Sequence, residues 1–463
     1  MVSLGVADAL CYNVLDCASR GLPQRKRQSE LDVKISPTED RAQRTDRFES
    51  VERVPRTGFA RAFAALRHRN FRLFFAGQLV SLSGTWMQSI AQGWLVLQLT
   101  NSAFLLGVVS ALQFLPVLLF SLFGGVVADR FPKRRLLLVT QSCAMVLAFA
   151  LAVLTSAGLV QVWHVMILAT LLGVVNAVDM PTRQAFVVEM VGKEDLMNAI
   201  ALNSSLFNGA RVIGPALGGI LIGWIGLAAC FYFNGLSFLA VIAGLLAMRV
   251  QSSVGASAIR QSIWMNISEG LCYIRQTPLI LLLMSQIGLL AVFGMNFNVV
   301  IPVLARDVLG TEATGYGLLM SAMGVGSFFG ALSLAYLSRT PRLSPLLIAA
   351  FFFGMLEVFL AGVRWYPLSA LTMIAIGFFF VNFGASANTL IQTTVPDRLR
   401  GRVMSVYSLV FAGSSPIGSM FAGTVAYNAG PVAPLFVGGL ICAIGATVGW
   451  RLSRREGNIA NVS

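Results

Sequence analysis

The chain has 463 residues, of which 56% are hydrophobic and 12% are charged. Soluble domains carry roughly 25% charged residues, so one water-exposed globule would have to hide an unusually large apolar surface in a single core. The 44 glycines suit helices that pack closely in a lipid bilayer, where small residues let backbones approach one another. The composition therefore excludes a soluble domain and indicates an integral membrane protein.

The formal net charge of +14 could indicate nucleic-acid binding, but the basic residues are distributed unevenly. Of the 34 lysines and arginines, 13 lie in residues 1–70, and 17 lie in alternate short loops or the C-terminal tail. The other set of loops holds only Arg306 and Arg364. This positive-inside pattern predicts a lipid bilayer and no nucleic acid as the partner, with both termini in the cytoplasm.

Residues 1–68 precede the first long apolar run and show no sustained hydrophobic period. We expect a disordered cytoplasmic extension here. A signal peptide is not expected, because no basic start leads into a continuous apolar core. The six cysteines include no Cys-x-x-Cys pair, so we expect neither a disulfide nor a metal site.

Beyond Phe71 the chain is built from apolar runs of about 20 residues, the length that crosses a bilayer. The predicted fold class is an all-α membrane protein with twelve transmembrane helices in two pseudo-symmetric six-helix halves. An even number of spans agrees with two termini on one side. We expect the spans at 72–97, 104–127, 136–157, 163–182, 199–225, 230–248, 279–304, 314–337, 344–363, 368–389, 404–427 and 432–450.

The predicted domains after the extension are an N-terminal half at 69–248, a linker at 249–278, a C-terminal half at 279–450 and a cytoplasmic tail at 451–463. Apolar residues recur at helical spacing between Ala258 and Arg275 of the linker, which indicates an amphipathic helix on the membrane surface.

The halves also resemble each other in sequence. An ungapped offset of 204 residues matches identical residues, and two such halves around a midplane site are typical of alternating-access transporters. The matched pairs are Val191 with Val395, Gly209 with Gly413, Ile213 with Ile417, Gly214 with Gly418, Gly219 with Gly423 and Gly226 with Gly430.

The loop after the second span contains a glycine, an aspartate and a basic cluster. A carboxylate at a cytoplasmic helix end can bond to the N-terminus of a neighbouring helix in one state and so close a gate. Alternatively, the basic cluster only fixes the topology. The pattern resembles the loop signature of the major facilitator superfamily, except that Pro132 replaces a usual glycine. The resemblance implies a gating loop formed by Gly125, Asp129, Arg130, Lys133 and Arg134.

Span five carries a glycine–proline pattern formed by Gly209, Gly214, Pro215, Gly218 and Gly219. Proline removes a backbone donor and the glycines permit close packing, so the helix can bend and seat tightly. The pattern resembles the signature of the superfamily's antiporters, which is associated with export. A packing kink without functional meaning is the alternative.

A third stretch, from Asp179 through Pro181 and Arg183 to Asn203, resembles the branch that holds enterobactin exporters and macrolide efflux proteins. The resemblance covers residues 67–455. It implies a monomeric secondary active transporter of the bacterial inner membrane, without a cofactor and not an enzyme. Its small-molecule cargo would be an amphipathic drug, macrolide or siderophore, exported in exchange for protons.

Three charged residues fall within the apolar runs, and a charge in hydrocarbon is expensive unless it has a partner, a cavity or a function. Glu357 lies roughly 20 Å from the cytoplasmic end of span nine at 1.5 Å per residue, and is a candidate proton carrier or a paired carboxylate. Asp179 is expected to pair with Arg130 or Arg134 in one conformation, as part of the gate. Arg211 is expected to bind an anionic group or a carboxylate; satisfaction by backbone carbonyls is the alternative.

Span one carries a polar stripe along one helical face, at steps of three and four residues. Aligned polar groups are unfavourable in lipid, so this face should line a water-filled cavity, although hydrogen bonds between helices are the alternative. The predicted cavity residues are Gln78, Ser81, Thr85, Gln88, Gln92, Gln113, Asn208, Asn296 and Asn298.

The sequence leaves other functions open. The same fold could import a metabolite or move a lysolipid, and a membrane receptor or scaffold would move nothing. An ATP-driven pump is not expected, because no GxxxxGK[ST] phosphate loop occurs.

Overall fold

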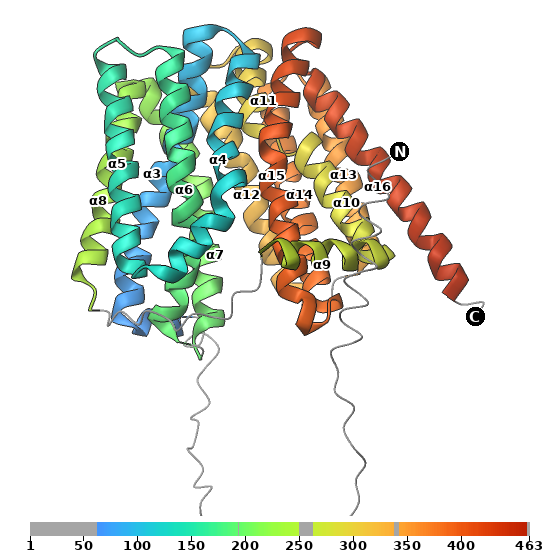
Figure 1. Cartoon of the computed structure of the whole chain (residues 1–463). Coiled ribbons are helices and arrows are strands. Elements are labelled where there is room, and N and C mark those ends of the chain that lie inside the picture. Colours follow the sequence, from blue (N-terminus) through green and yellow to red (C-terminus); the bar gives the residue numbers. More distant parts are fainter. Residues whose placement is uncertain (1–62, 193, 250–262, 338–341, 461–463) are drawn as a thin grey trace, which may run out of the picture. The chain divides into compact units, whose positions relative to one another are not determined.

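The computed structural model describes residues 63–192, 194–249, 263–337 and 342–460. Its Cα positions separate into two units, Met1–Ala64 and Ala65–Ser463. The first unit lies almost wholly outside the described residues, as does most of the predicted extension at 1–68. The second unit is a bundle of long helices (Figure 1).

Each predicted span coincides with a helical segment. Eleven segments are long and apolar enough to cross a membrane, and α3 is equally long but more polar because it carries the glutamine stripe. Together they form an all-α membrane protein. The elements are η1 (Ala64–Arg67), α3 (Arg69–Thr100), α4 (Ala103–Arg130), α5 (Lys133–Ser156), α6 (Val162–Val191), α7 (Leu196–Ile225), α8 (Leu227–Ala247), α9 (Ile263–Gln276), α10 (Pro278–Phe293), α11 (Phe297–Val303), η2 (Leu304–Val308), α12 (Ala313–Leu337), α13 (Leu343–Gly362), α14 (Tyr366–Thr394), α15 (Asp397–Ala429) and α16 (Ala433–Ala460).

The two halves use the same pattern of helix pairs. In the first half α4 packs along α6, α5 along α8 and α3 along α7. In the second half the corresponding pairs are α12 with α14, α13 with α16 and α10 with α15. The fold therefore has the pseudo-symmetric six-helix halves that the sequence predicts.

The glycines matched by the 204-residue offset occupy equivalent places in α7 and α15. Gly214 packs against α3, and its counterpart Gly418 packs against α10 and Asn296. Gly226 and Gly430 end their helices with φ of 96° and 101°, a backbone conformation that favours glycine. These two matched pairs of glycines therefore have matched structural roles.

The halves meet along two helix pairs, α7 with α12 and α4 with α15. Glycines make both crossings close: a Cβ at Gly317 would lie 2.4 Å from the Pro215 carbonyl oxygen, and one at Gly107 would lie 2.6 Å from that of Ser419. Gly219 of the predicted antiporter motif faces α12, whereas Gly218 faces Met87 of α3. Gly209 has no neighbouring atom within 4 Å among the described residues.

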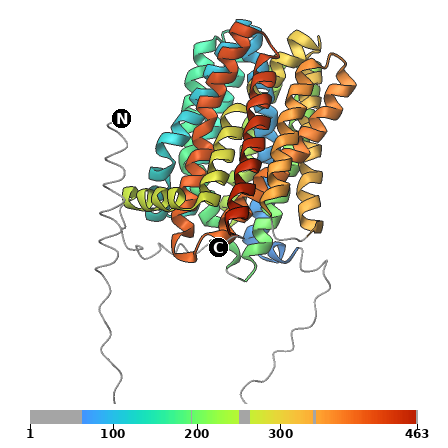
Figure 2. The ribbon, with the colours of Figure 1, turned by 90° about the vertical axis from the view of Figure 1, so that its right-hand side faces the viewer.

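The two ends of the bundle differ. We call the end where α4 ends and α5 begins the basic end, because Arg130, Lys133 and Arg134 lie there. The predicted amphipathic helix is present as α9 and runs across this end of the bundle (Figures 1 and 2). Its Glu269 forms an ion pair with Arg402 of α15. The part of that prediction before Ile263 lies outside the described residues.

At the opposite end, buried side chains join the halves. Trp94 of α3 stacks on Tyr316 of α12 with ring centroids 6.3 Å apart, and both belong to a buried apolar cluster drawn from the two halves. Arg306 Nη1 donates a hydrogen bond of 2.9 Å to the Leu97 carbonyl oxygen. At the basic end, a separate cluster that includes Phe74 and Phe186 is built from the first half alone.

Candidate substrate cavity

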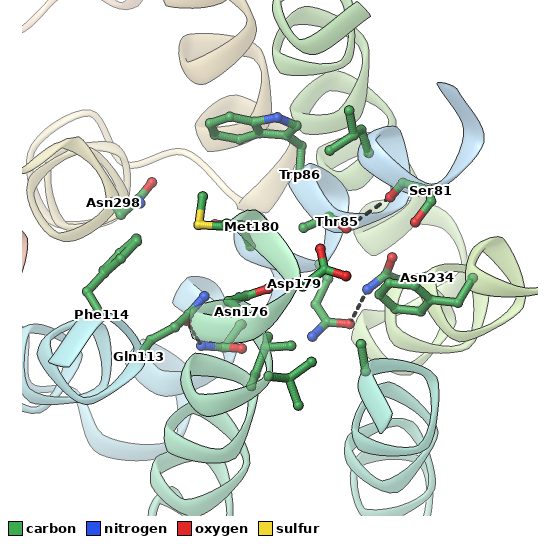
Figure 3. A pocket seen from close by; sticks show the side chains of 18 of the residues that line it. Ser81, Thr85, Trp86, Gln113, Phe114, Asn176, Asp179, Met180, Asn234 and Asn298 are labelled. Carbon is green, nitrogen blue, oxygen red and sulfur yellow. Dashed lines mark hydrogen bonds between the residues drawn. The ribbon is translucent and has the colours of Figure 1, made fainter. Parts of the chain in front are cut away.

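A cavity of about 410 Å³ lies among the helices of the first half. All of its lining residues belong to α3–α8 except Asn298 of α11, which comes from the second half. Figure 3 shows polar side chains from several helices facing this space. Six predicted cavity residues line it: Ser81, Thr85, Gln88, Gln92, Gln113 and Asn298.

Three predicted residues do not line the cavity. Gln78 lies one turn away and accepts a hydrogen bond from Arg183. Asn208 Nδ2 donates to the Ser204 carbonyl oxygen at 2.9 Å, and Asn296 Nδ2 donates to that of Val292 at 2.7 Å. Asn208 therefore bonds within α7, and Asn296, in the break between α10 and α11, bonds back to α10.

The stripe on α3 both lines the cavity and ties α3 to its neighbours. Gln92 Nε2 donates to Gln113 Oε1 of α4 at 3.0 Å. Gln88 Oε1 accepts from Asn234 Nδ2 of α8 at 2.7 Å. The stripe therefore matches both interpretations, cavity lining and hydrogen bonding between helices, because these amides line the cavity wall and also connect α3 to other helices.

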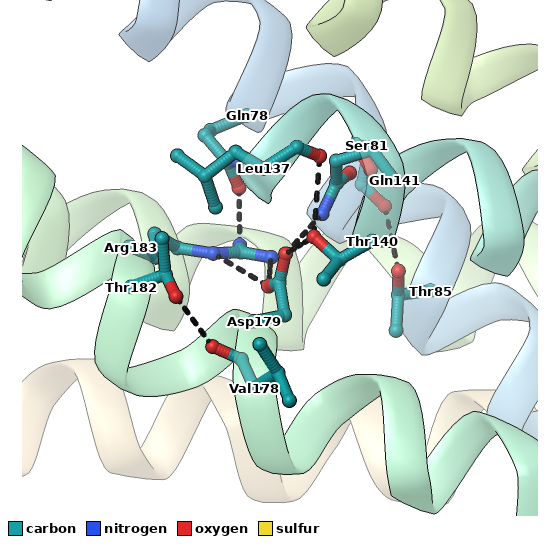
Figure 4. Close-up of polar contacts among 10 residues, drawn as sticks. All are labelled: Gln78, Ser81, Thr85, Leu137, Thr140, Gln141, Val178, Asp179, Thr182 and Arg183. Carbon is teal, nitrogen blue, oxygen red and sulfur yellow. Dashed lines mark hydrogen bonds and ion pairs between the residues drawn. The ribbon is translucent and has the colours of Figure 1, made fainter. Parts of the chain in front are cut away.

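Asp179 is the centre of a buried network on α6 (Figure 4). Its side chain is almost fully buried and accepts hydrogen bonds from Thr140 Oγ1 at 2.7 Å and Gln141 Nε2 at 2.8 Å. It also forms an ion pair with Arg183, one helical turn away. Arg183 Nη1 in turn donates to Gln78 Oε1 of α3. The network therefore connects α3, α5 and α6 at the cavity wall.

The partner of Asp179 in this structure differs from the predicted one. Arg134 donates instead to the carbonyl oxygens of Leu245 and Leu246 at 2.6 and 2.9 Å, at the end of α8, and Arg130 is exposed. The predicted fourth span ends at residue 182, which leaves Arg183 in a loop. The helix instead continues to Val191, and the ion pair with Asp179 compensates the charge of Arg183 within it.

The predicted gating loop lies at the basic end. Lys133 Nζ and Glu189 Oε1 of α6 form an ion pair of 2.5 Å. Asp129 is exposed, and α5 begins at Lys133 with no side-chain hydrogen bond to its N-terminus, so Asp129 does not cap this helix here. Gly125 has no neighbouring atom within 4 Å among the described residues.

Glu357 lies away from the cavity, between α13 and α16. It is almost fully buried, and a Cβ on Gly439 of α16 would lie 2.8 Å from its Cβ. Its Oε2 atom has no hydrogen-bond partner among the described residues. No residue of α13 lines the cavity, so Glu357 and the cargo-sized space are separate features.

Arg211 of α7 lies between two aromatic rings. Its guanidinium carbon is 5.6 Å from the ring centroid of Trp86 on α3 and 5.0 Å from that of Phe380 on α14. Trp86 also lines the cavity. The partners of Arg211 are thus aromatic faces from both halves, rather than the carboxylate or backbone carbonyls that the sequence analysis considered.

The cavity contains polar residues that the sequence analysis did not assign to it. Asn176 lies three residues before Asp179 and Arg183 four after it, so the three share one face of α6. This spacing is visible in the sequence. Gln141 and Asn234, on α5 and α8, carry no such signal, because their neighbours are set by the packing of other helices.

Comparison with known proteins supports this architecture as that of a small-molecule transporter. The family model described as "Transmembrane secretion effector" matches residues 60–463. A staphyloferrin A transporter of Staphylococcus aureus is 26% identical over 75% of this chain and 87% of its own length. The multidrug efflux pump Tap of Mycolicibacterium fortuitum is 27% identical over 77% and 89%, respectively. Macrolide efflux protein A of Streptococcus pyogenes is 24% identical over 78% and 92%.

Solved structures share the fold at lower identity. A bacterial homologue of the lysosomal transporter spinster aligns with a TM-score of 0.65 and 14% identity, over 86% of this chain and 98% of that one. A bacterial homologue of the iron transporter ferroportin aligns with a TM-score of 0.61 and 16% identity, over 82% and 98%. With its sequence matched from residue 60 to its end, this chain belongs to the transmembrane secretion effector family, within the major facilitator superfamily.

Proposed function

We propose that this protein exports an amphipathic small molecule, such as a drug, macrolide or siderophore, across the bacterial cytoplasmic membrane in exchange for protons. The observation that carries the proposal is the polar cavity inside an otherwise apolar helix bundle. Such a space would be expensive in lipid without a function. The names of three relatives, which denote a siderophore transporter, a multidrug pump and a macrolide efflux protein, support the cargo class.

Alternating access is supported by the contrast between the two ends. The buried apolar cluster around Trp94 and Tyr316 joins the halves at the opposite end, as expected for a transporter closed on that side. The glycine crossings of α7 with α12 and α4 with α15 give two seams along which the halves can rock. In this proposal the basic end and both termini face the cytoplasm.

Proton coupling is assigned in this proposal to Glu357. The carboxyl is buried where α13 and α16 pack through Gly354 and Gly439, so its protonation state would act on the packing of the second half rather than on cargo directly. Asp179 and Arg183 would hold the cavity wall in this state and release it in the other.

Export and coupling are tested together in everted membrane vesicles. We expect vesicles that contain the chain to accumulate erythromycin or ethidium when a proton gradient is imposed, and to lose the accumulation when an ionophore collapses it. Vesicles without the chain are the control. Unchanged accumulation after the gradient collapses would defeat the coupling, and accumulation only in right-side-out vesicles would favour an importer.

Asp129→Asn is expected to reduce turnover to a small fraction of the wild-type rate while leaving membrane insertion intact. The substitution keeps the size of the side chain and removes the charge that we assign to the gate in the other conformation. Asp307→Asn is the control, because Asp307 pairs with Arg306 at the opposite end. Wild-type turnover in the Asp129→Asn variant, with equal protein in the membrane, would remove Asp129 from the mechanism.

A further inference from the structure

Arg211 lies in the middle of a membrane-spanning helix, and no described carboxylate pairs with it. The guanidiniums of Arg183, Arg306 and Arg402 each form an ion pair with a carboxylate. Arg211 forms no ion pair with a described residue, and both of its ring partners are neutral. Since an uncompensated charge at this depth is expensive, the position is expected to serve a ligand.

The orientation of Arg211 indicates which part of the guanidinium remains available. Trp86 and Phe380 stand near it from opposite halves, and aromatic contacts of this kind use the charge rather than the N–H donors. Arg211 donates no side-chain hydrogen bond to a described residue, and none of its nitrogens is both buried and unpartnered. Its N–H donors therefore have no hydrogen-bond partner among the described residues.

Five N–H donors in a planar fork match a planar oxyanion in a bidentate arrangement. The aromatic surroundings favour an oxyanion attached to an apolar or aromatic body: Trp86 lines the cavity, and Phe207, which also lines it, packs against Trp86 at 5.7 Å between ring centroids. The neighbouring Asp179–Arg183 pair adds no net charge to the wall. Arg211 is thus the charge beside the cavity that a ligand can neutralise.

We infer that Arg211 binds a carboxylate group of the cargo at the seam between the two halves, with Trp86 and Phe380 holding its aromatic or apolar body. The inference rests on the proposed function only in treating the bound molecule as cargo. Because Trp86 belongs to the first half and Phe380 to the second, a molecule bound at Arg211 would contact both halves.

The test is equilibrium binding to the purified chain in nanodiscs of neutral lipid, with no gradient. The probes are 2-naphthoate and its neutral isostere 2-naphthamide, which differ in charge but hardly in shape. A bidentate charged hydrogen bond is worth about 1.5–3 kcal/mol, so the wild-type chain should bind naphthoate at least about tenfold more tightly. Arg211→Gln should remove this preference, whereas the control Arg306→Gln should keep it.

Arg211→Lys keeps the charge but loses the fork, so it should retain only part of the preference and also serves if Arg211→Gln does not fold. Equal binding of the two probes to the wild-type chain, or a preference that survives in Arg211→Gln or is undiminished in Arg211→Lys, would overturn the inference. Loss of naphthoate when phosphatidylglycerol replaces part of the neutral lipid would identify a lipid headgroup as the occupant instead. If vesicle export fails while Arg211-dependent binding of naphthoate persists, the proposed function is wrong but the oxyanion site at Arg211 is supported.

Discussion

Asp179→Asn is expected to destabilise the folded chain by about 3 kcal/mol, the usual effect of removing one partner of a buried ion pair. The asparagine leaves Arg183 charged at the cavity wall, because an NH2 donor replaces the carboxylate oxygen that pairs with it, and only one neutral oxygen remains to accept from Thr140 and Gln141. The free energy of unfolding can be measured by titrating the purified protein in mixed micelles with sodium dodecyl sulfate.

The same loss should be partly reversed by a second substitution. Adding Arg183→Gln to Asp179→Asn removes the unpaired charge, so the double variant should be more stable than Asp179→Asn alone. Asp397→Asn is the control, because Asp397 forms an exposed pair with Arg400 and exposed pairs contribute little. Additive losses in the double variant would show that the two side chains are not coupled.

Gly317→Val is expected to abolish export and to destabilise the chain by about 1–3 kcal/mol through overpacking. A Cβ at this position would lie 2.4 Å from the Pro215 carbonyl oxygen and 2.8 Å from the Gly219 Cα. Backbone atoms cannot yield as a flexible side chain can, so α12 would have to move away from α7. The seam between the halves would open.

The matched control is Gly384→Val, in the interior of α14. No atom lies within 4 Å of a Cβ at Gly384 among the described residues, so this variant carries the same change in helix propensity without the clash. Export from everted vesicles and the free energy of unfolding in mixed micelles should both be lower for Gly317→Val than for Gly384→Val. Equal behaviour would show that the close crossing at Gly317 is not required.

The fold could be predicted from the sequence because its signals are local. Apolar runs of bilayer length gave all twelve helices, and the paired glycines of α7 and α15 indicated the duplication. The end of α6 was predicted wrongly, since Arg183 was treated as a loop residue. Its partner Asp179 lies four residues earlier on the same helix, and this spacing favours a continuous helix.

The cavity could be predicted only in part. The polar face of α3 follows from helical periodicity, so Ser81, Thr85, Gln88 and Gln92 were found. Residues contributed by other helices depend on packing that no local pattern records. Asn296 and Asn298 show this well: α10 ends at Phe293 and α11 begins at Phe297, and the break leaves only Asn298 on the cavity.

The hydrogen bonds that already join Gln88 to Asn234 and Gln92 to Gln113 have a consequence for what the protein can release. A bound molecule that takes over one of these paired amide groups displaces a hydrogen bond that already exists. The net gain from each such exchange is small. Such a lining suits a transporter, which must release its cargo on one side of the membrane as readily as it binds the cargo on the other.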